Sequence, residues 1–255
     1  MNKVTDIYEI SDLTSDGRGV ARRADGRVIL IDGALPGDKV LAKIEHEPRR
    51  GVLLGRVTEL LIASPHRIPH PCIHHTHGCP GSPLGALDYG RALTWKVDHL
   101  RETLRRVGNL KSPEISDPVE AKHHYGYRDR VELRLEWLGG QWELTYGKLD
   151  RLVPVRQCLL PAEPVQWALQ SLAGGLVNAE IPSPEQRWER GIRLLLRENG
   201  QGGAIAVLFI VARRPFDTAP FEKWLSNGEI QGWQIRRTSS INSRMFRSTV
   251  LREHG

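Results

Sequence analysis

The first 61 residues alternate between short apolar-rich segments and turn-forming sequences, and this punctuation limits the fold more than any other feature of the chain. The sequences Ser15-Asp16-Gly17, Ala24-Asp25-Gly26 and Leu35-Pro36-Gly37-Asp38 favour tight turns. The segments around them predict strands at residues 4–10, 19–22, 27–31, 38–45 and 53–61. Five strands in about 60 residues suit a small OB-like β-barrel, whose face commonly binds single-stranded nucleic acid.

Aromatic side chains that could stack on bases are scarce in this segment, where Tyr8 is the one example. Binding there would depend on guanidinium groups, which pair bidentately with phosphate. The candidate nucleic-acid contacts of the segment are Arg18, Arg22, Arg49 and Arg50.

The charge balance also points to a polyanionic partner, because the chain carries a net charge of +6 and has a pI near 9.4. Arginine is preferred over lysine in the last quarter, where few acids accompany it. A solvated surface is the ordinary alternative explanation. These arginines are Arg187, Arg190, Arg193, Arg197, Arg213, Arg214, Arg236, Arg237, Arg244, Arg247 and Arg252. Together with Arg128 and Arg130, we take Arg236 and Arg237 as candidate nucleic-acid contacts of the second half.

Composition places the chain among globular proteins, with 40% hydrophobic and 26% charged residues. No segment approaches the roughly 18 apolar residues that a bilayer span requires, and the N-terminus opens no apolar run. Three cysteines are too few for a secreted disulfide framework. We therefore expect a cytoplasmic protein without a membrane partner.

Residues 66–82 hold two of the three cysteines and five of the ten histidines. Cys72 and Cys79, with Cys158 and either Ser82 or a histidine such as His77, would make a four-ligand set. Such a set suits an iron-sulfur cluster if thiolates dominate, or zinc if imidazoles complete it. A His-rich surface loop with two buried cysteines, binding no metal, is the alternative.

The next segment predicts a helix over residues 86–107, which Gly108 would end. Its apolar residues recur at spacings of three and four and predict one stripe that packs inward. The stripe comprises Leu93, Val97, Leu100, Leu104 and Val107.

The second half predicts an α+β domain with an antiparallel sheet. Residues 127–136 alternate polar and apolar positions, and Gly139-Gly140 would close a hairpin into residues 141–146. A second hairpin is expected from residues 192–197 to 204–211, turning at the glycine-rich run 199–203. Helices are expected at residues 162–179 and 221–225, and a further strand at 232–237.

Three phrases of the N-terminal segment resemble a TRAM domain, the RNA-binding β-barrel at the front of several RNA-modifying enzymes. They are Gly17-Arg18-Gly19-Val20-Ala21-Arg22, Asp25-Gly26-Arg27-Val28 and Gly33-Ala34-Leu35-Pro36-Gly37-Asp38-Lys39-Val40. The resemblance implies a TRAM barrel at residues 1–61, a Cys/His-rich linker at 62–84 and an α+β RNA-recognition domain at 85–255.

The order of the later pieces extends the resemblance to the bacterial RNA uracil-5-methyltransferases. These pieces are the 72–82 segment, Tyr89, Lys96 and Leu100 on the helix, Tyr127-Arg128-Asp129-Arg130-Val131, and Val153-Pro154-Val155-Arg156-Gln157-Cys158. In that family four cysteines hold a [4Fe-4S] cluster, and Cys72, Cys79 and Cys158 match three of them. Ser82 stands where the fourth is expected, and the first gap is one residue longer than the family pattern.

The resemblance covers the part of that family that precedes its catalytic domain, and no cysteine follows Cys158 that could attack uracil. We expect no catalytic residues and no S-adenosylmethionine site here, and the glycine run before the apolar segment 204–211 is read as a turn. The leading hypothesis is an RNA-binding protein, for rRNA or tRNA, without methyl transfer alone. The alternatives are the RNA-recognition part of a truncated or split methyltransferase with a separate catalytic subunit, and a metal-binding or redox-sensing module.

Overall fold

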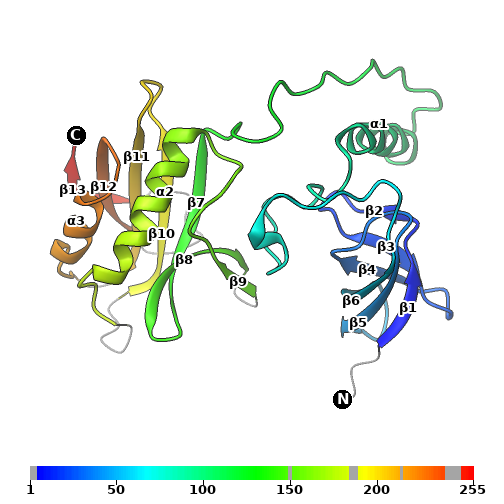
Figure 1. Cartoon of the computed structure of the whole chain (residues 1–255), viewed down its shortest axis with the longest axis horizontal. Coiled ribbons are helices and arrows are strands. Elements are labelled where there is room, and N and C mark those ends of the chain that lie inside the picture. Colours follow the sequence, from blue (N-terminus) through cyan, green and yellow to red (C-terminus); the bar gives the residue numbers. More distant parts are fainter. Residues whose placement is uncertain (1–4, 149–150, 184–188, 213–214, 239–247) are drawn as a thin grey trace. The chain divides into compact units, whose positions relative to one another are not determined.

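The turn-punctuated N-terminal segment forms a six-stranded mixed sheet in the order β1-β5-β6-β4-β3-β2 (Figure 1). The computed structural model describes residues 5–148, 151–183, 189–212, 215–238 and 248–255. The strands of this first sheet are β1 (Thr5–Glu9), β2 (Asp12–Leu13), β3 (Gly19–Arg22), β4 (Val28–Asp32), β5 (Lys39–His46) and β6 (Leu53–Ile62). The expected strands are therefore confirmed to within a residue or two, and β2 is an addition.

Alternation along these strands places one face of the first sheet in a core around Ile29, Ile31, Val40 and Leu53. Register shifts between β5 and β6 bend this long pair, as β-bulges do. The described pairings leave β1 and β2 at the two ends of the strand order, and β4 and β6 pair in parallel. The sheet is thus half of a barrel, and the expected closed OB-like order is not confirmed.

Two compact units divide the chain. The N-terminal unit comprises residues 1–75 and 82–121, and the C-terminal unit comprises residues 76–81 and 122–255. The N-terminal unit contains the first sheet, a single 3-10 turn (Ile73–His75) and the helix α1 (Tyr89–Arg106). Asp88 caps α1, because its carboxylate accepts a hydrogen bond from the Arg91 amide at 3.1 Å.

Helix α1 packs on the first sheet through a different face from the one predicted. Ala92 is its one buried residue, and Trp95 packs beside it in a small apolar cluster with Leu13 and Leu35 of the sheet. On the predicted stripe, Leu100 is 47% exposed, so the prediction that the stripe packs inward is wrong. The spacing of apolar residues located a helix but not the face that it buries.

The C-terminal unit is built on a seven-stranded sheet in the order β13-β12-β11-β10-β7-β8-β9. Its strands are β7 (Arg130–Leu138), β8 (Gln141–Lys148), β9 (Arg151–Pro154), β10 (Glu189–Glu198), β11 (Ala204–Ala212), β12 (Gly232–Thr238) and β13 (Thr249–His254). The β7–β8 and β10–β11 hairpins are confirmed. Gly139 and Gly140 both have positive φ angles, which a tight hairpin turn requires and glycine adopts without strain.

Two helices pack on this second sheet, α2 (Glu163–Gly175), continued by a 3-10 turn (Leu176–Asn178), and α3 (Ala219–Ser226). The predicted apolar side of α2 is buried, with Val165, Leu169 and Leu172 fully enclosed. Helix α3 connects β11 to β12, and these two strands pair in parallel. The predicted antiparallel sheet is therefore wrong at this pair, because a helical crossover returns the chain to the same end of the sheet. Among the described residues, no helix is long and apolar enough to cross a membrane.

Candidate nucleic-acid interface and the Cys/His segment

A buried carboxylate fixes the turn before β5 to the segment that follows β6. The side chain of Asp38 is fully enclosed and accepts hydrogen bonds from the amides of Leu35 (2.7 Å) and Ser64 (2.8 Å). It also pairs with the guanidinium of Arg67, whose Nε lies 3.1 Å from Oδ1. Such a carboxylate is stable inside only because its oxygens are fully engaged. These contacts join the turn at residues 35–38 to residues 64–67 in one surface.

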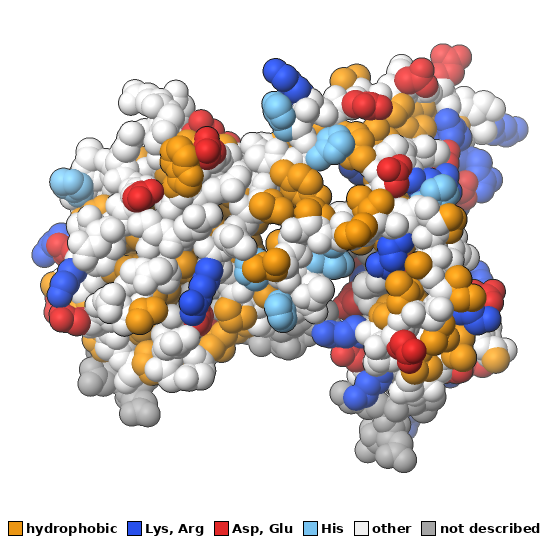
Figure 2. Space-filling view, viewed as in Figure 1, with side chains coloured by type: hydrophobic (Ala, Val, Ile, Leu, Met, Phe, Trp, Pro, Cys, Tyr) orange, Lys and Arg blue, Asp and Glu red, His pale blue; other side chains and the backbone are white. Residues whose placement is uncertain are grey.

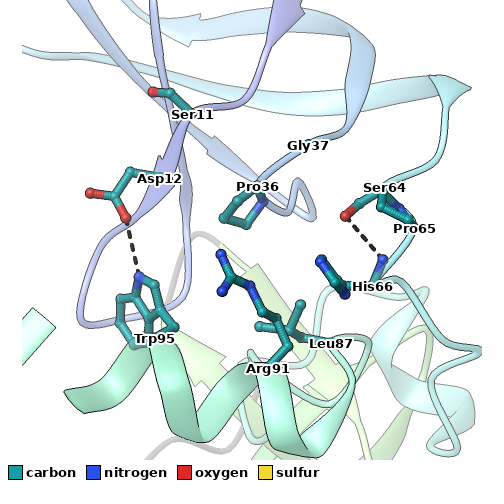
Figure 3. Close-up of a pocket in the computed structure, with 10 residues that line it drawn as sticks. All are labelled: Ser11, Asp12, Pro36, Gly37, Ser64, Pro65, His66, Leu87, Arg91 and Trp95. Atoms are coloured by element: carbon teal, nitrogen blue, oxygen red, sulfur yellow. Dashed lines mark hydrogen bonds between the residues drawn. The ribbon is translucent and has the colours of Figure 1, made fainter. Parts of the chain in front are cut away.

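That surface and helix α1 enclose a pocket of about 310 Å³ within the N-terminal unit (Figure 3). Its walls are formed by Ser11, Asp12, Pro36, Gly37, Ser64, Pro65, His66, Leu87, Arg91 and Trp95. The Trp95 indole Nε1 donates to Asp12 Oδ1 at 3.1 Å, and the Trp95 ring stacks on His99 with centroids 4.9 Å apart. In Figure 3 the Arg91 side chain reaches from α1 toward Pro36, beside the ring of His66. The pocket thus combines apolar walls with the Arg91 guanidinium, the His66 imidazole and the Asp12 carboxylate.

The predicted RNA contacts of the first sheet fall into two groups. Arg18 is held by Asp16 at 2.7 Å. Arg22, Arg49 and Arg50 are exposed, and they adjoin a network in which Arg23 and Arg27 both pair with Glu47. That network joins the β3–β4 turn to the β5–β6 loop, so the structure brings these three arginines to one end of the sheet. On the face seen in Figure 2, basic and acidic side chains are interspersed over the N-terminal unit.

The predicted RNA contacts of the C-terminal unit differ in exposure and in whether their guanidinium groups already have hydrogen-bond partners. Arg128 donates to the Gly81 carbonyl at 3.0 Å and lies over the Tyr127 ring at 5.8 Å. Arg236 donates to Ser248 Oγ at 2.8 Å and to Gln234 Oε1 at 2.9 Å. Arg130 is exposed beside Asp129, and Arg237 is half-buried. Arg187, Arg213, Arg214, Arg244 and Arg247 lie outside the described residues.

The histidines of the Cys/His segment bind one another and the backbone. Both ring nitrogens of His70 are engaged, Nδ1 by the Cys72 amide at 3.0 Å and Nε2 with the Ser82 carbonyl at 3.0 Å. The His70 and His75 rings stack with centroids 3.9 Å apart. Burial, aided by His70 and then Arg67, lowers the pKa of His75 to about 4. His77 is exposed.

The predicted metal ligands are divided between the two units. Cys72, whose Sγ lies 3.7 Å from His74 Nδ1, and Ser82 belong to the N-terminal unit, whereas Cys79 and buried Cys158 belong to the C-terminal unit. Burial and then the neighbouring Cys158 raise the pKa of the Tyr146 phenol. The described residues contain no group of three or more His, Cys, Asp or Glu side chains placed to hold a metal ion. The iron-sulfur prediction therefore has no support among the described residues, and Cys72, Cys79, Cys158 and Ser82 stay predicted ligands.

Residues 9–58, which include most of the first sheet, match the TRAM domain. The first sheet is therefore a TRAM domain, a small β-rich module. Beyond that domain the chain is homologous to RNA uracil-5-methyltransferases over much of its length. It is 38% identical over 184 residues to the 23S rRNA (uracil(1939)-C(5))-methyltransferase RlmD of Methylococcus capsulatus, covering 69% of this chain and 41% of that protein. It is 33% identical over 231 residues to RlmD of Halomonas elongata, covering 89% of this chain and 44% of the relative.

A solved structure shares the fold across 98% of this chain and 55% of its own, with a TM-score of 0.63 and 18% identity. It is the tRNA (uracil-54, C5)-methyltransferase of Pyrococcus abyssi in complex with S-adenosyl-L-homocysteine. The chain spans less than half of the two RlmD relatives. These likenesses do not support the expectations of a truncated, inactive form or of a separate catalytic subunit.

The pocket on α1 was missed from the sequence, although a signal was present. Arg91 and Trp95 are four residues apart and therefore lie on one face of the helix. Trp95 is also the first tryptophan of the chain. These two residues form one wall of the pocket, and the leucine spacing gave no indication of it.

Proposed function

We propose that this chain binds RNA and provides the RNA recognition of a uracil-C5 methyltransferase-type protein. Ribosomal RNA is the first candidate ligand, and tRNA is the second. The TRAM match over residues 9–58 carries the proposal. In this proposal residues 1–61 and 85–255 both contact RNA and the segment 62–84 joins them. The exposed arginines at the β3–β4 and β5–β6 end of the first sheet, Arg22, Arg49 and Arg50, supply phosphate contacts.

The test is fluorescence anisotropy of the full chain with a 23S rRNA fragment around the uridine named for the relatives, a tRNA and a DNA duplex, at several salt concentrations. If each arginine contacts one phosphate, the double variant Arg49→Gln/Arg50→Gln should reduce the log-log salt slope by about 1.4, since each contact on a single strand contributes roughly 0.7. The control Arg101→Gln/Arg105→Gln removes two charges from the exposed side of α1. A salt-independent affinity, or equal effects of the two double variants, would contradict the proposal.

Uracil-C5 methyl transfer is the second candidate function, and the 38% identity to an RlmD relative favours it. It is tested by incubating the full chain with the same rRNA fragment and S-adenosylmethionine that carries a tritiated methyl group. Label at the C5 position of one uridine would establish the activity. RNA binding without label would restrict the function of this chain to recognition.

A further inference from the structure

We propose that the pocket between the first sheet and α1 binds a single unpaired nucleotide of the RNA, with its base against Trp95 and its phosphate on Arg91. The inference deepens the proposed RNA binding and rests on it. It assigns a nucleotide site to residues on α1, outside the segment that matches the TRAM domain.

The size of the pocket suits one nucleotide. Its volume of about 310 Å³ lies at the lower end of the range for small-molecule sites, which begins near 300 Å³. A base with its ribose and phosphate fills such a space, whereas a nucleic-acid duplex cannot enter it. Arg91 and His66 are exposed at the pocket, so a nucleotide can enter while still attached to its strand.

The apolar wall is already ordered before anything binds. The Trp95 ring is fixed by its hydrogen bond to Asp12 and by its stack on His99. Leu87 is a buried part of the same lining, to which the Pro36–Gly37 turn also contributes. Because these groups need no ordering on binding, stacking of a base loses little entropy there.

The Arg91 guanidinium favours an anion beside that wall. In the described part of the chain no carboxylate pairs with the Arg91 guanidinium, in contrast to Arg101 and Arg105 later on the helix, which pair with Asp98 and Glu102. The carboxylate of Asp12 is engaged by Trp95, and that of Asp88 caps the helix. An uncommitted guanidinium next to His66 presents donors in the planar arrangement that suits a phosphate.

The experiment compares full-length variants in anisotropy titrations with eight-residue oligouridylate and oligoadenylate RNA. We expect Arg91→Gln to weaken binding about 5-fold and to reduce the salt slope by about 0.7. Arg106→Gln is the matched control, because it removes the same charge from the same helix about 22 Å away along its axis. We expect less than a 2-fold effect from it.

The aromatic wall is tested with a pair of substitutions at Trp95. Trp95→Leu keeps an apolar side chain but no ring, and we expect a loss of about 10-fold. Trp95→Phe also loses the hydrogen bond to Asp12 but keeps a ring, and we expect affinity within about 3-fold of the wild type. Circular dichroism of each variant separates lost binding from lost folding. Equal effects of Leu and Phe in folded proteins would overturn the stacking role.

The remaining outcomes distinguish the pocket from the proposed function. Unchanged RNA affinity in both Arg91→Gln and Trp95→Leu, with a wild type that binds, overturns the pocket and leaves RNA binding in place. A wild type that binds no RNA overturns both. Competition by inorganic phosphate as effective as competition by uridine monophosphate would mean a simple anion site and would overturn the nucleotide assignment.

Discussion

The indole N–H of Trp95 donates a hydrogen bond to Oδ1 of Asp12 across 3.1 Å, although the two residues are 83 positions apart. This contact attaches the exposed helix α1 to the short strand β2. It also places a carboxylate at a pocket that we assign to a phosphate-bearing ligand, where the negative charge opposes binding.

The charge and the hydrogen bond of Asp12 can be separated by Asp12→Asn. The amide oxygen of asparagine can still accept the hydrogen bond from Trp95, so the free energy of unfolding should change by less than about 0.5 kcal/mol. RNA affinity should rise about 2- to 5-fold, because a negative charge leaves the pocket. Asp12→Leu removes the acceptor as well, and it should loosen α1 in hydrogen exchange. Weaker RNA binding by Asp12→Asn would contradict the assignment.

The helix shows where sequence patterning stops being informative. Leu93, Val97 and Leu100 follow helical spacing, and the helix exists, yet the face that packs on the sheet carries Ala92 and Trp95. Periodicity reports that apolar residues share a face, but not which surface meets that face. The residues that position the pocket could be found only from the tertiary contact.

Removal of the buried carboxylate in Asp38→Ala should destabilise the N-terminal unit by about 3–5 kcal/mol, since Arg67 would keep its charge and two amides would lose their acceptor. The control Asp16→Ala removes the exposed partner of Arg18 and should cost less than about 1 kcal/mol. Urea unfolding of the N-terminal unit can be followed by the ¹⁹F resonance of fluorotryptophan at position 95. Trp95 is the one tryptophan of that unit, because the others follow residue 121 and belong to the C-terminal unit. Similar losses in the two variants would show that the Asp38 network contributes little.

The C-terminal unit was easier to predict where contacts are local. The two hairpins depend on glycine turns, and Gly139 and Gly140 have the positive φ angles that the sequence implied. The β11–β12 pair depends on a crossover through α3, which no local pattern reveals. The metal ligands stay a prediction, because Cys72 and Cys158 belong to different units and no local sequence pattern shows whether the two thiols meet.

Ser82 provides a chemical test of the metal site. A serine hydroxyl loses its proton at a far higher pH than a thiol, and His70 is engaged at both nitrogens, so we expect the wild-type chain to retain less than one cluster after anaerobic reconstitution with iron and sulfide. Ser82→Cys should increase the bound iron and the visible absorption of the protein. The control is Ser64→Cys, which adds a thiol at a buried position of the same unit. About four irons per wild-type chain would contradict this expectation.

His75 gives the N-terminal unit a pH-dependent stability with a defined sign. Its pKa is about 4 in the folded chain, where the ring is half-buried against His70, and the ordinary value is 6.5. Between these values the unfolded chain binds a proton that the folded chain does not, so the free energy of unfolding should fall as the pH drops from 6.5 to about 4 and then level off. Without screening, each unit of pKa difference would change the free energy of unfolding by about 1.4 kcal/mol. Solvent screens the half-buried ring, so we expect a smaller total loss of about 1–2 kcal/mol.

Two histidine variants test this origin of the acid sensitivity. His75→Gln should remove this part of the pH dependence, whereas His77→Gln, at an exposed position two residues later, should leave it intact. Urea unfolding of both variants and the wild type at about pH 4.5 and pH 7, followed at Trp95 with chelator present, measures the difference. An equal change between the two pH values in His75→Gln and the wild type would show that the stacked ring does not control the acid sensitivity of this unit.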